Sequence, residues 1–251
     1  MNKDNIKALI LAAGRGSRMD HITANQPKCF SKLGSKRLID WQLESLQANG
    51  IKDIAIVTGY LSEKFDEYSV KKINNLEWNS SNMIVSLLKA STYINDSTII
   101  SYSDIVYHPN VVEILKHANY DIVLAYDKNW YKQWQKRFDD PRIDAETFKI
   151  TKEGIITEIG SKANTLEEIQ GQYLGLFKLT PNGIAIIEDI VEEYFDRRDT
   201  LDMTEVFQLI INKGINIYGV DVDSTWFEID SPSDLILAQK LYNSGELDIS
   251  L

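Results

Sequence analysis

The nine residues LAAGRGSRM, residues 11–19, follow directly on an apolar run and interrupt it with two glycines. Glycine adopts positive φ without strain, so the chain can turn tightly here and bring backbone N–H groups close to phosphate oxygens. Arg18 adds a planar cationic group that can hold a phosphate through two hydrogen bonds. We call residues 11–19 the glycine loop and predict that it holds a polyphosphate. A plain tight turn is the alternative reading of the glycines alone.

Two better-known glycine motifs do not fit this loop. The dinucleotide fingerprint G-x-G-x-x-G needs a third glycine where this chain has Met19, and the P-loop pattern G-x-x-x-x-G-K-[ST] is absent. Pro27 and Lys28 follow the loop instead, and Lys28 supplies a second mobile positive charge. The loop, Arg18 and Lys28 together predict a triphosphate site more strongly than the glycines do.

The apolar run that leads into the glycine loop, residues 8–12, is typical of a buried parallel strand. Three further runs repeat this pattern, at residues 54–57, 97–102 and 121–126. Helical periodicity separates them, at residues 38–49, 62–68, 83–90 and 109–118. This alternation predicts an α/β fold, with a Rossmann-like, mainly parallel sheet covered by helices on both faces. Ligands bind at the carboxyl ends of the strands in such sheets, where the glycine loop and Asp104 both lie.

From about residue 127 the pattern changes. Residues 130–144 are polar and aromatic without a clear period, which predicts a loop or insertion over the edge of the sheet. Shorter strands are expected at 148–150, 155–159, 173–179 and 216–222, and helices at 181–195, 203–213 and from Pro232 onward. The absence of repeats and linkers predicts one domain over residues 1–251. We call its insertion, at about residues 127–175, the lid.

Composition and charge limit the function classes. Apolar residues make up 43% of the chain and no apolar run reaches the ~20 residues of a membrane helix. A single cysteine, Cys29, leaves no internal disulfide, so we expect a cytoplasmic protein that contacts no membrane. The net charge of -10 argues against nucleic-acid binding. Residues 1–40, however, carry eight Lys or Arg against three Asp, which suits a small polyanion.

The pattern L-A-A-G-x-G-x-R-M followed by Pro27-Lys28 resembles the signature of the sugar-phosphate nucleotidyltransferase superfamily. The resemblance extends through Asp104 to WFEID at residues 226–230. It implies a fold of the nucleotide-diphospho-sugar transferase type, and a loop that wraps the phosphates of an NTP. It gives Arg18 and Lys28 the catalytic role of stabilising charge on the reacting and leaving phosphates. The nucleotide-binding residues that it implies here are Leu11, Ala12, Ala13, Gly14, Arg15, Gly16, Ser17 and Ser103.

Two aspartates are candidate metal ligands. Asp104 ends a strand predicted to be buried, where a carboxylate is costly unless it is paired or binds a cation. Asp230 precedes the last predicted helix, and a helix N-cap is the alternative role for it. Mg²⁺ is typically held by one or two carboxylates together with phosphate oxygens and water. The resemblance places both aspartates on Mg²⁺ beside the α-phosphate, so Mg²⁺ is the expected cofactor.

The segment WNSSNMIVSL, residues 78–87, occupies the place where this superfamily reads the base. It resembles the cytidylyltransferases for phosphocholine and 2-aminoethylphosphonate, which carry Asn-x-x-Asn and a hydrophobic residue leading to Ser. Uridylyl and thymidylyl enzymes usually have a Gln-x-x-x-Gly-x-Ala-like segment here. Asn82 and Ser86 offer donors and acceptors that can pair with the edge of cytosine. Asn82 could also cap the following helix, and one residue could serve both roles.

The lid resembles the insertion that lies over the acceptor in phosphonate-type cytidylyltransferases. Its aromatic and acidic groups suit a cationic amine, through cation–π and ionic contacts, and a lysine suits the acceptor's phosphate. Packing between the lid and the sheet is the alternative role of the aromatic residues, and a solvated acid is the alternative for Glu146. The acceptor-binding residues expected are Trp130, Arg137, Glu146, Lys162 and Tyr173.

These features predict a Mg²⁺-dependent cytidylyltransferase. It would move CMP from CTP to the phosphate or phosphonate of a small, amine-bearing acceptor and release pyrophosphate. Phosphocholine, aminoethylphosphonate and a phosphorylated amino acid such as phosphoglutamine remain open as acceptors, and a homodimer is compatible with the sequence. An ionised phosphate is already a nucleophile, so the three histidines are not required as bases. The alternatives are a sugar-1-phosphate uridylyl- or thymidylyltransferase and a non-catalytic nucleotide sensor; the missing third glycine disfavours a dehydrogenase.

Overall fold

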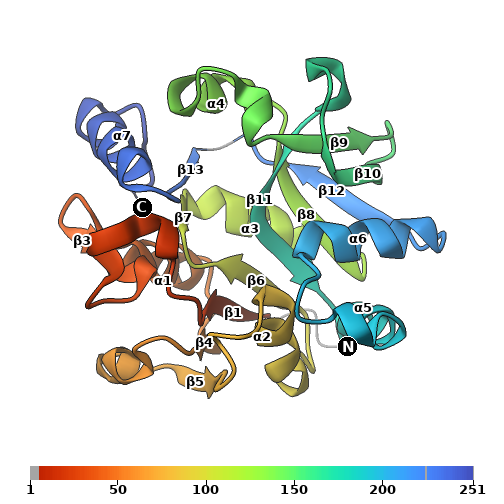
Figure 1. Ribbon diagram of the computed structural model, residues 1–251, viewed down its shortest axis with the longest axis horizontal. Helices are drawn as coiled ribbons and strands as arrows, with labels where there is room; N and C mark the ends of the chain where they lie inside the picture. The colour runs from red at the N-terminus through yellow and green to blue at the C-terminus, as the bar shows by residue number, and fades with distance from the viewer. Residues whose placement is uncertain (1–5, 224, 251) are drawn as a thin grey trace.

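A computed structural model describes residues 6–223 and 225–250, and its centre is a nine-stranded sheet (Figure 1). The strand order is β5-β4-β1-β6-β11-β8-β12-β10-β9. These strands are β1 Lys7–Ala12, β4 Ile54–Thr58, β5 Lys71–Asn74, β6 Thr98–Tyr102, β8 Ile122–Asp127, β9 Glu146–Ile150, β10 Ile155–Lys162, β11 Gln172–Leu179 and β12 Ile217–Asp221. Two small ladders pair β2 Lys32–Leu33 with β3 Lys36–Arg37, and β7 Ile105–Tyr107 with β13 Trp226–Glu228.

The predicted mainly parallel sheet is confirmed, with one feature that the sequence did not predict. β1 is parallel to β4 and β6, β5 is parallel to β4, and β12 is parallel to β8. β11 lies between β6 and β8 and is antiparallel to both, and β10 is antiparallel to β12 and β9. The lid supplies β9 and β10, which extend the same sheet beyond β12. The chain then returns from β10 to pair beside β8 in the opposite direction, as β11.

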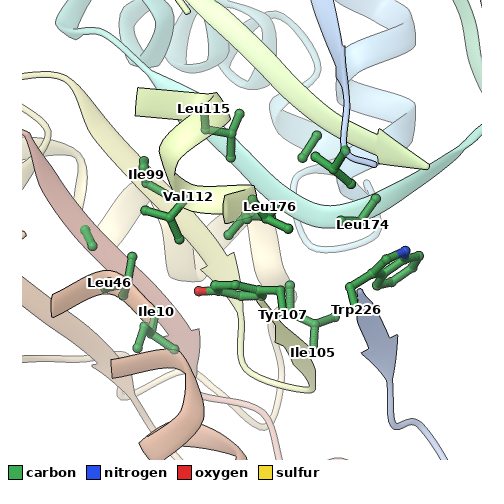
Figure 2. Packing of buried hydrophobic residues seen from close by; sticks show 14 of the residues in the cluster. Ile10, Leu46, Ile99, Ile105, Tyr107, Val112, Leu115, Leu174, Leu176 and Trp226 are labelled. Atoms are coloured by element: carbon green, nitrogen blue, oxygen red, sulfur yellow. The ribbon is translucent and has the colours of Figure 1, made fainter. Parts of the chain in front are cut away.

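Helices cover both faces, as predicted. They are α1 Leu38–Ala48, α2 Met83–Lys89, α3 Pro109–His117, α4 Tyr131–Arg137, α5 Pro181–Glu193, α6 Met203–Asn212 and α7 Pro232–Ser244. Alternate residues of β1 belong to the apolar clusters on the two faces of the sheet. Ile10 shares a cluster with side chains of α1 and α3, and Leu9 shares one with side chains of α2, α5 and α6. Figure 2 shows part of the first cluster, including Ile10, Leu46 and Val112.

A third apolar cluster fixes α7 against the start of the chain. It joins Met19, the last residue of the glycine loop, to Phe227 of β13, to Ile229 and to Leu241 of α7. Figure 1 shows α7, in blue, beside red segments that follow β1. This cluster therefore holds the C-terminal helix against the segment that contains the glycine loop.

The structure corrects one local prediction: α4 occupies residues 131–137, where an irregular loop was expected. The short helix predicted at residues 62–68 is present as a 3₁₀ helix over residues 62–67. Trp130 and Trp134 explain α4, since their buried rings anchor a short helix whose sequence has no helical period of its own. Short β7 and β13 also escaped prediction because they pair only with each other, far apart in sequence. No helix in the described ranges is both long and apolar enough to cross a bilayer.

Candidate active site

The glycine loop leaves β1 as an open turn. Leu11, Ala12 and Ala13 are buried at the end of the strand, and Gly14 and Arg15 are exposed. Gly16 has φ 67° and ψ 54°, the left-handed conformation that glycine adopts without strain. Within the described part of the chain, the backbone N–H groups of residues 14–16 donate to no acceptor. They are therefore free to bind an anion, as the sequence predicted.

Gly16 also makes room for Lys28. A Cβ at position 16 would lie 2.7 Å from Cδ of Lys28, which is closer than carbon atoms approach. The lysine side chain therefore crosses directly against the loop backbone. Arg15 lies with its guanidinium 5.8 Å from the ring centroid of Tyr60, and Ser17 is exposed at the start of the 3₁₀ helix Ser17–Thr23. No local pattern signals the contact between Gly16 and Lys28, because it depends on the fold of residues 24–30.

The two predicted metal ligands, Asp104 and Asp230, come together through the β7–β13 ladder. Asp104 lies in the turn between β6 and β7, next to the half-buried Ser103. Glu228 of β13 pairs with Ile105 of β7, and the N–H of Ile229 donates to the carbonyl of Asp104 at 2.9 Å. Asp230 follows immediately, so the ladder sets the two carboxylates side by side.

Lys28 bridges these carboxylates. Its Nζ lies 2.7 Å from Oδ2 of Asp104 and 2.6 Å from Oδ1 of Asp230, and its side chain is 8% exposed. Burial by itself would lower the pKa of Lys28, but the charges and hydrogen bonds of the two carboxylates outweigh it and raise that pKa. Arg18, 69% exposed, places Nη2 3.1 Å from the same oxygen of Asp230. Both predicted catalytic cations therefore meet the predicted metal ligands.

The residues present fit a divalent cation. Oδ1 of Asp104 is buried and has no hydrogen-bond partner, so this oxygen is free to coordinate. In the ranges that the structure describes, no group of three or more His, Cys, Asp or Glu residues could hold a metal. Two carboxylates with phosphate oxygens and water form the ligand set that Mg²⁺ typically has.

Glu228 is a third acid at this point, and the sequence patterns did not single it out. Burial, and then repulsion from Asp230 and Asp104, raises the pKa of Glu228 to about 8, while Arg137 opposes the shift. The signal was in the sequence, in the WFEID stretch, but the alternation of β13 is too short to recognise there. Asp104, Asp230 and Glu228 therefore form one acidic cluster, which Lys28, Arg18 and Arg137 contact as cations.

A small cavity of about 130 Å³ adjoins the glycine loop, where the base was expected. Asn82 and Ser86 both line it, but their polar atoms are engaged within the protein. Oδ1 of Asn82 accepts from the N–H of Val85 and caps α2, while its Nδ2 donates to the carbonyls of Arg198 and Leu201. Its alternative role as helix cap is thus present. The remaining lining residues are Leu11, Ala13, Gly14, Trp78, Ser81 and Met83.

Ser86 and Ser81 share a partner that the sequence did not reveal. The Oγ of Ser86 donates to the carbonyl of Asn82 at 3.1 Å and accepts from Nδ2 of Asn75 at 3.0 Å. Nδ2 of Asn75 also donates to Oγ of Ser81 at 3.1 Å. Among the described residues the hydroxyl hydrogen of Ser81 and the indole N–H of Trp78 have no acceptor, so both side chains can still donate a hydrogen bond in this cavity.

A larger cavity of about 460 Å³ opens on the other side of Asp230. Its wall is strongly acidic, with Asp144, Glu146, Asp202, Glu228 and Asp230. Burial raises the pKa values of Asp144, Glu146 and the Tyr173 hydroxyl. A separate cavity of about 610 Å³, around Lys178 and Tyr218, lies at the opposite edge of the sheet and contains none of the predicted site residues.

The structure brings two of the five predicted acceptor residues, Glu146 and Tyr173, to this wall and leaves three away from it. Trp130 is 3% exposed and its Nε1 donates to the carbonyl of Ile169, so it packs between lid and sheet; Trp134 lines the cavity instead. Lys162 is exposed at the end of β10, opposite Glu146 in the β9–β10 ladder. The guanidinium of Arg137 faces two carboxylates inside the protein. Because α4 was not predicted, the sequence could not show that Trp134 lines the cavity while Trp130 packs inside the protein.

The family model of the MobA-like NTP transferase domain matches residues 8–149, the part that holds the glycine loop, Lys28 and Asp104. The protein belongs to this family and is a nucleotidyltransferase.

Among its relatives is the CTP:phosphoglutamine cytidylyltransferase of Campylobacter jejuni, 38% identical over 248 residues, which cover 92% of this chain and 98% of the relative. The choline-phosphate cytidylyltransferase of Streptococcus pneumoniae is 33% identical over 132 residues, 50% of this chain and 58% of that protein. The fold also matches two solved structures at 22% identity. They are the CTP:phosphocholine cytidylyltransferase of S. pneumoniae (TM-score 0.71, 95% of this chain and 99% of that one) and the inositol-1-phosphate CTP transferase of T. maritima (0.75, 98% of each).

Proposed function

We propose that the protein transfers a cytidylyl group from CTP to the phosphate or phosphonate of a small, amine-bearing acceptor. The observation that carries this proposal is the meeting of Lys28, Arg18, Asp104 and Asp230 between a phosphate-binding loop and an acidic cavity. The relative that matches almost the whole chain acts on CTP and phosphoglutamine, and a second relative acts on choline phosphate. Both acceptors join a phosphate to a nitrogen-bearing group.

The chain's residues divide the reaction between them. Backbone N–H groups of residues 14–16 hold the triphosphate, and Arg18 and Lys28 offset negative charge on the α-phosphate and on the leaving group. An acceptor oxygen attacks the α-phosphorus in line, the bond to the bridging oxygen of the β-phosphate breaks, and pyrophosphate leaves. Asp104 and Asp230 would hold Mg²⁺, which when bound polarises the phosphoryl oxygens. The acceptor oxygen is already ionised, so no proton has to be removed from it.

The acidic wall favours an acceptor with a positive charge. Asp202 caps α6 through the N–H of Glu205 at 2.7 Å and accepts from Oγ1 of Thr204 at 3.1 Å, so its carboxylate is fixed in direction beside Glu146. Gln172 and Thr204 line the same cavity, and so do the aromatic residues Tyr102, Trp134 and Tyr173. Such a wall suits a positively charged amine, through ionic and hydrogen-bond contacts with its carboxylates and cation–π contacts with its rings. An aminated phosphate, such as a phosphorylated amino acid, meets this description.

The proposed activity is tested by pyrophosphate release with CTP, UTP, dTTP, ATP and GTP, each combined with a panel of aminated phosphates, phosphonates and sugar 1-phosphates. We expect turnover with CTP and an aminated acceptor. Faster turnover of UTP or dTTP with a sugar 1-phosphate would show the alternative transferase. Tight CTP binding with no turnover of any acceptor would show a nucleotide sensor.

Glu146→Gln tests the recognition of the amine. A hydrogen bond to a charged group contributes ~1.5–3 kcal/mol, so we expect KM for the aminated acceptor to rise about 10- to 100-fold, with KM for CTP unchanged. In the wild type, acceptor binding should weaken as the pH falls through the raised pKa of Glu146, because its protonated form no longer attracts an ammonium. Steady-state kinetics at several pH values measure both effects. Glu153→Gln, at an exposed turn, is the matched control. If KM for the acceptor is unchanged in Glu146→Gln, Glu146 does not bind the acceptor.

A further inference from the structure

Arg137 is a buried cation with no access to the acceptor. It is the last residue of α4, and its side chain is 1% exposed. Nη1 lies 2.8 Å from Oε2 of Glu228, and Nε lies 2.9 Å from Oδ1 of Asp234. The guanidinium also packs on the ring of Trp134, at 5.1 Å from its centroid. A buried charge persists only where it is paired, and Arg137 is paired with Glu228, with Asp234 and, at 4.0 Å, with Asp144 of the acidic cavity.

Asp234 contacts both Arg137 and the backbone of Asp230, a predicted metal ligand. Its second oxygen, Oδ2, accepts from the backbone N–H of Asp230 at 3.2 Å and from that of Ser231 at 2.9 Å. It also accepts from Oγ of Ser231 at 2.7 Å, and that Oγ in turn accepts from the N–H of Asp234 at 3.2 Å, which completes the capping box of α7. One carboxylate therefore holds Arg137 with one oxygen and the backbone of Asp230 with the other.

The same helix forms part of the acceptor wall. Trp134, one turn before Arg137, lines the acidic cavity, and its Nε1 donates to Oδ2 of Asp144 at 3.0 Å. α4 therefore contacts the acceptor cavity through Trp134 and the backbone of Asp230 through Arg137 and Asp234. A displacement of α4 would move both.

We propose that Arg137 is a positioning residue: it holds Asp230 in the direction needed for the metal and nucleotide, and it couples the acceptor wall on α4 to that carboxylate. This inference rests on the proposed function for its catalytic meaning. Arginine suits the role because its planar fork reaches two carboxylates in different directions, which the single ammonium of a lysine does not. Side chains that orient a metal ligand typically change metal affinity or activity 10- to 100-fold when they are removed.

The test compares Arg137→Met and Arg137→Lys with Lys136→Met. Lys136 is the preceding residue on α4 and pairs with Glu246 at the surface, so it is a matched control for loss of one charge from the helix. We expect Arg137→Met to raise the Mg²⁺ concentration for half-maximal turnover about 10- to 100-fold, and to weaken Mn²⁺ binding with CTP alone to the same degree. Arg137→Lys should restore only part of this. Wild-type Mn²⁺ binding in a folded Arg137→Met protein would overturn the proposal.

Amide exchange separates this proposal from the proposed function. The N–H groups of Asp230 and Ser231 should exchange at least about tenfold faster in Arg137→Met than in the wild type, with no substrate present. If the wild type fails to turn over CTP, the proposed function falls, and the exchange result still decides the role of Arg137. If Arg137→Met does not fold, Asp234→Asn replaces it, since an amide oxygen can still cap α7 but no longer attracts Arg137. Unchanged exchange and Mn²⁺ binding in Asp234→Asn would overturn the proposal.

Discussion

Asp104→Asn is expected to reduce pyrophosphate release from CTP at least about 10²–10³-fold, a loss of ~3–4 kcal/mol of transition-state stabilisation. Asp104 is one of two carboxylates in reach of Lys28, and it carries the buried oxygen that has no donor. Asparagine has the same shape but no charge, so the change removes half of the negative charge that would hold Mg²⁺. The loss should appear mainly in kcat, and excess Mg²⁺ should recover part of it.

The fold should survive this substitution. Asp104 is an ion-pair partner of the buried Lys28, but Asp230 keeps that ammonium paired at 2.6 Å, and the amide oxygen of asparagine can still accept a hydrogen bond from it. We expect a cooperative unfolding transition with a melting temperature somewhat below that of the wild type, measured by circular dichroism with and without Mg²⁺. Asp66→Asn makes the same chemical change in an exposed ion pair with Lys72 and should leave both rate and stability unchanged. Normal turnover by Asp104→Asn would show that this carboxylate does not hold the metal.

Much of this site could be predicted because its parts follow local patterns. The run that leads into the glycine loop is apolar at every position, as a strand buried on both faces must be, and it forms β1. Asp104 follows a second predicted strand, residues 97–102, with only Ser103 between them. In a sheet whose β1 and β6 are parallel, the ends of both runs lie at the same edge. Spacing along the chain is therefore enough to place half of the site.

The other half depends on contacts between distant segments. β7 and β13 have three residues each, too few for a recognisable period, yet their pairing sets Asp230 beside Asp104. Arg137 is the clearest case. Its sequence neighbours are polar and aromatic, which suggested a loop or lid. Only the structure shows that the guanidinium of Arg137 packs on the ring of Trp134 and turns inward toward Asp234. A residue type that binds phosphates and carboxylates alike cannot be assigned by type alone.

The base-binding residues show a different limit. The sequence indicates correctly that residues 78–87 adjoin the glycine loop, but it cannot show which polar atoms are already satisfied. Asn82 joins α2 to residues 198–201 through both of its amide hydrogens. The selection of cytosine is therefore expected to use groups around Asn82, Ser81 and Trp78 among them, and Asn82 to keep the cavity in shape.

Lys28→Ala is expected to slow turnover about 10²–10³-fold through the chemical step, with a smaller change in KM for CTP. Lys28 stands between Asp104 and Asp230, where it neutralises both. A divalent cation held by the two aspartates would neutralise them in place of Lys28, whose ammonium could then pair with the phosphates of the nucleotide. Gly16 leaves the space along which the lysine stem lies.

This double role predicts a second effect that a plain phosphate-binding lysine would not have. Without Lys28, two carboxylates face each other with no buried counter-ion, so Lys28→Ala should lower the melting temperature in chelator and regain it when Mg²⁺ is added. The stabilisation by Mg²⁺ alone should exceed that of the wild type, whose ammonium competes for the same two oxygens. Lys32→Ala, an exposed lysine in β2, is the control for loss of charge near the loop. A rise in KM for CTP at unchanged kcat, with no new dependence of stability on Mg²⁺, would show that Lys28 only binds the nucleotide and does not assist the chemical step.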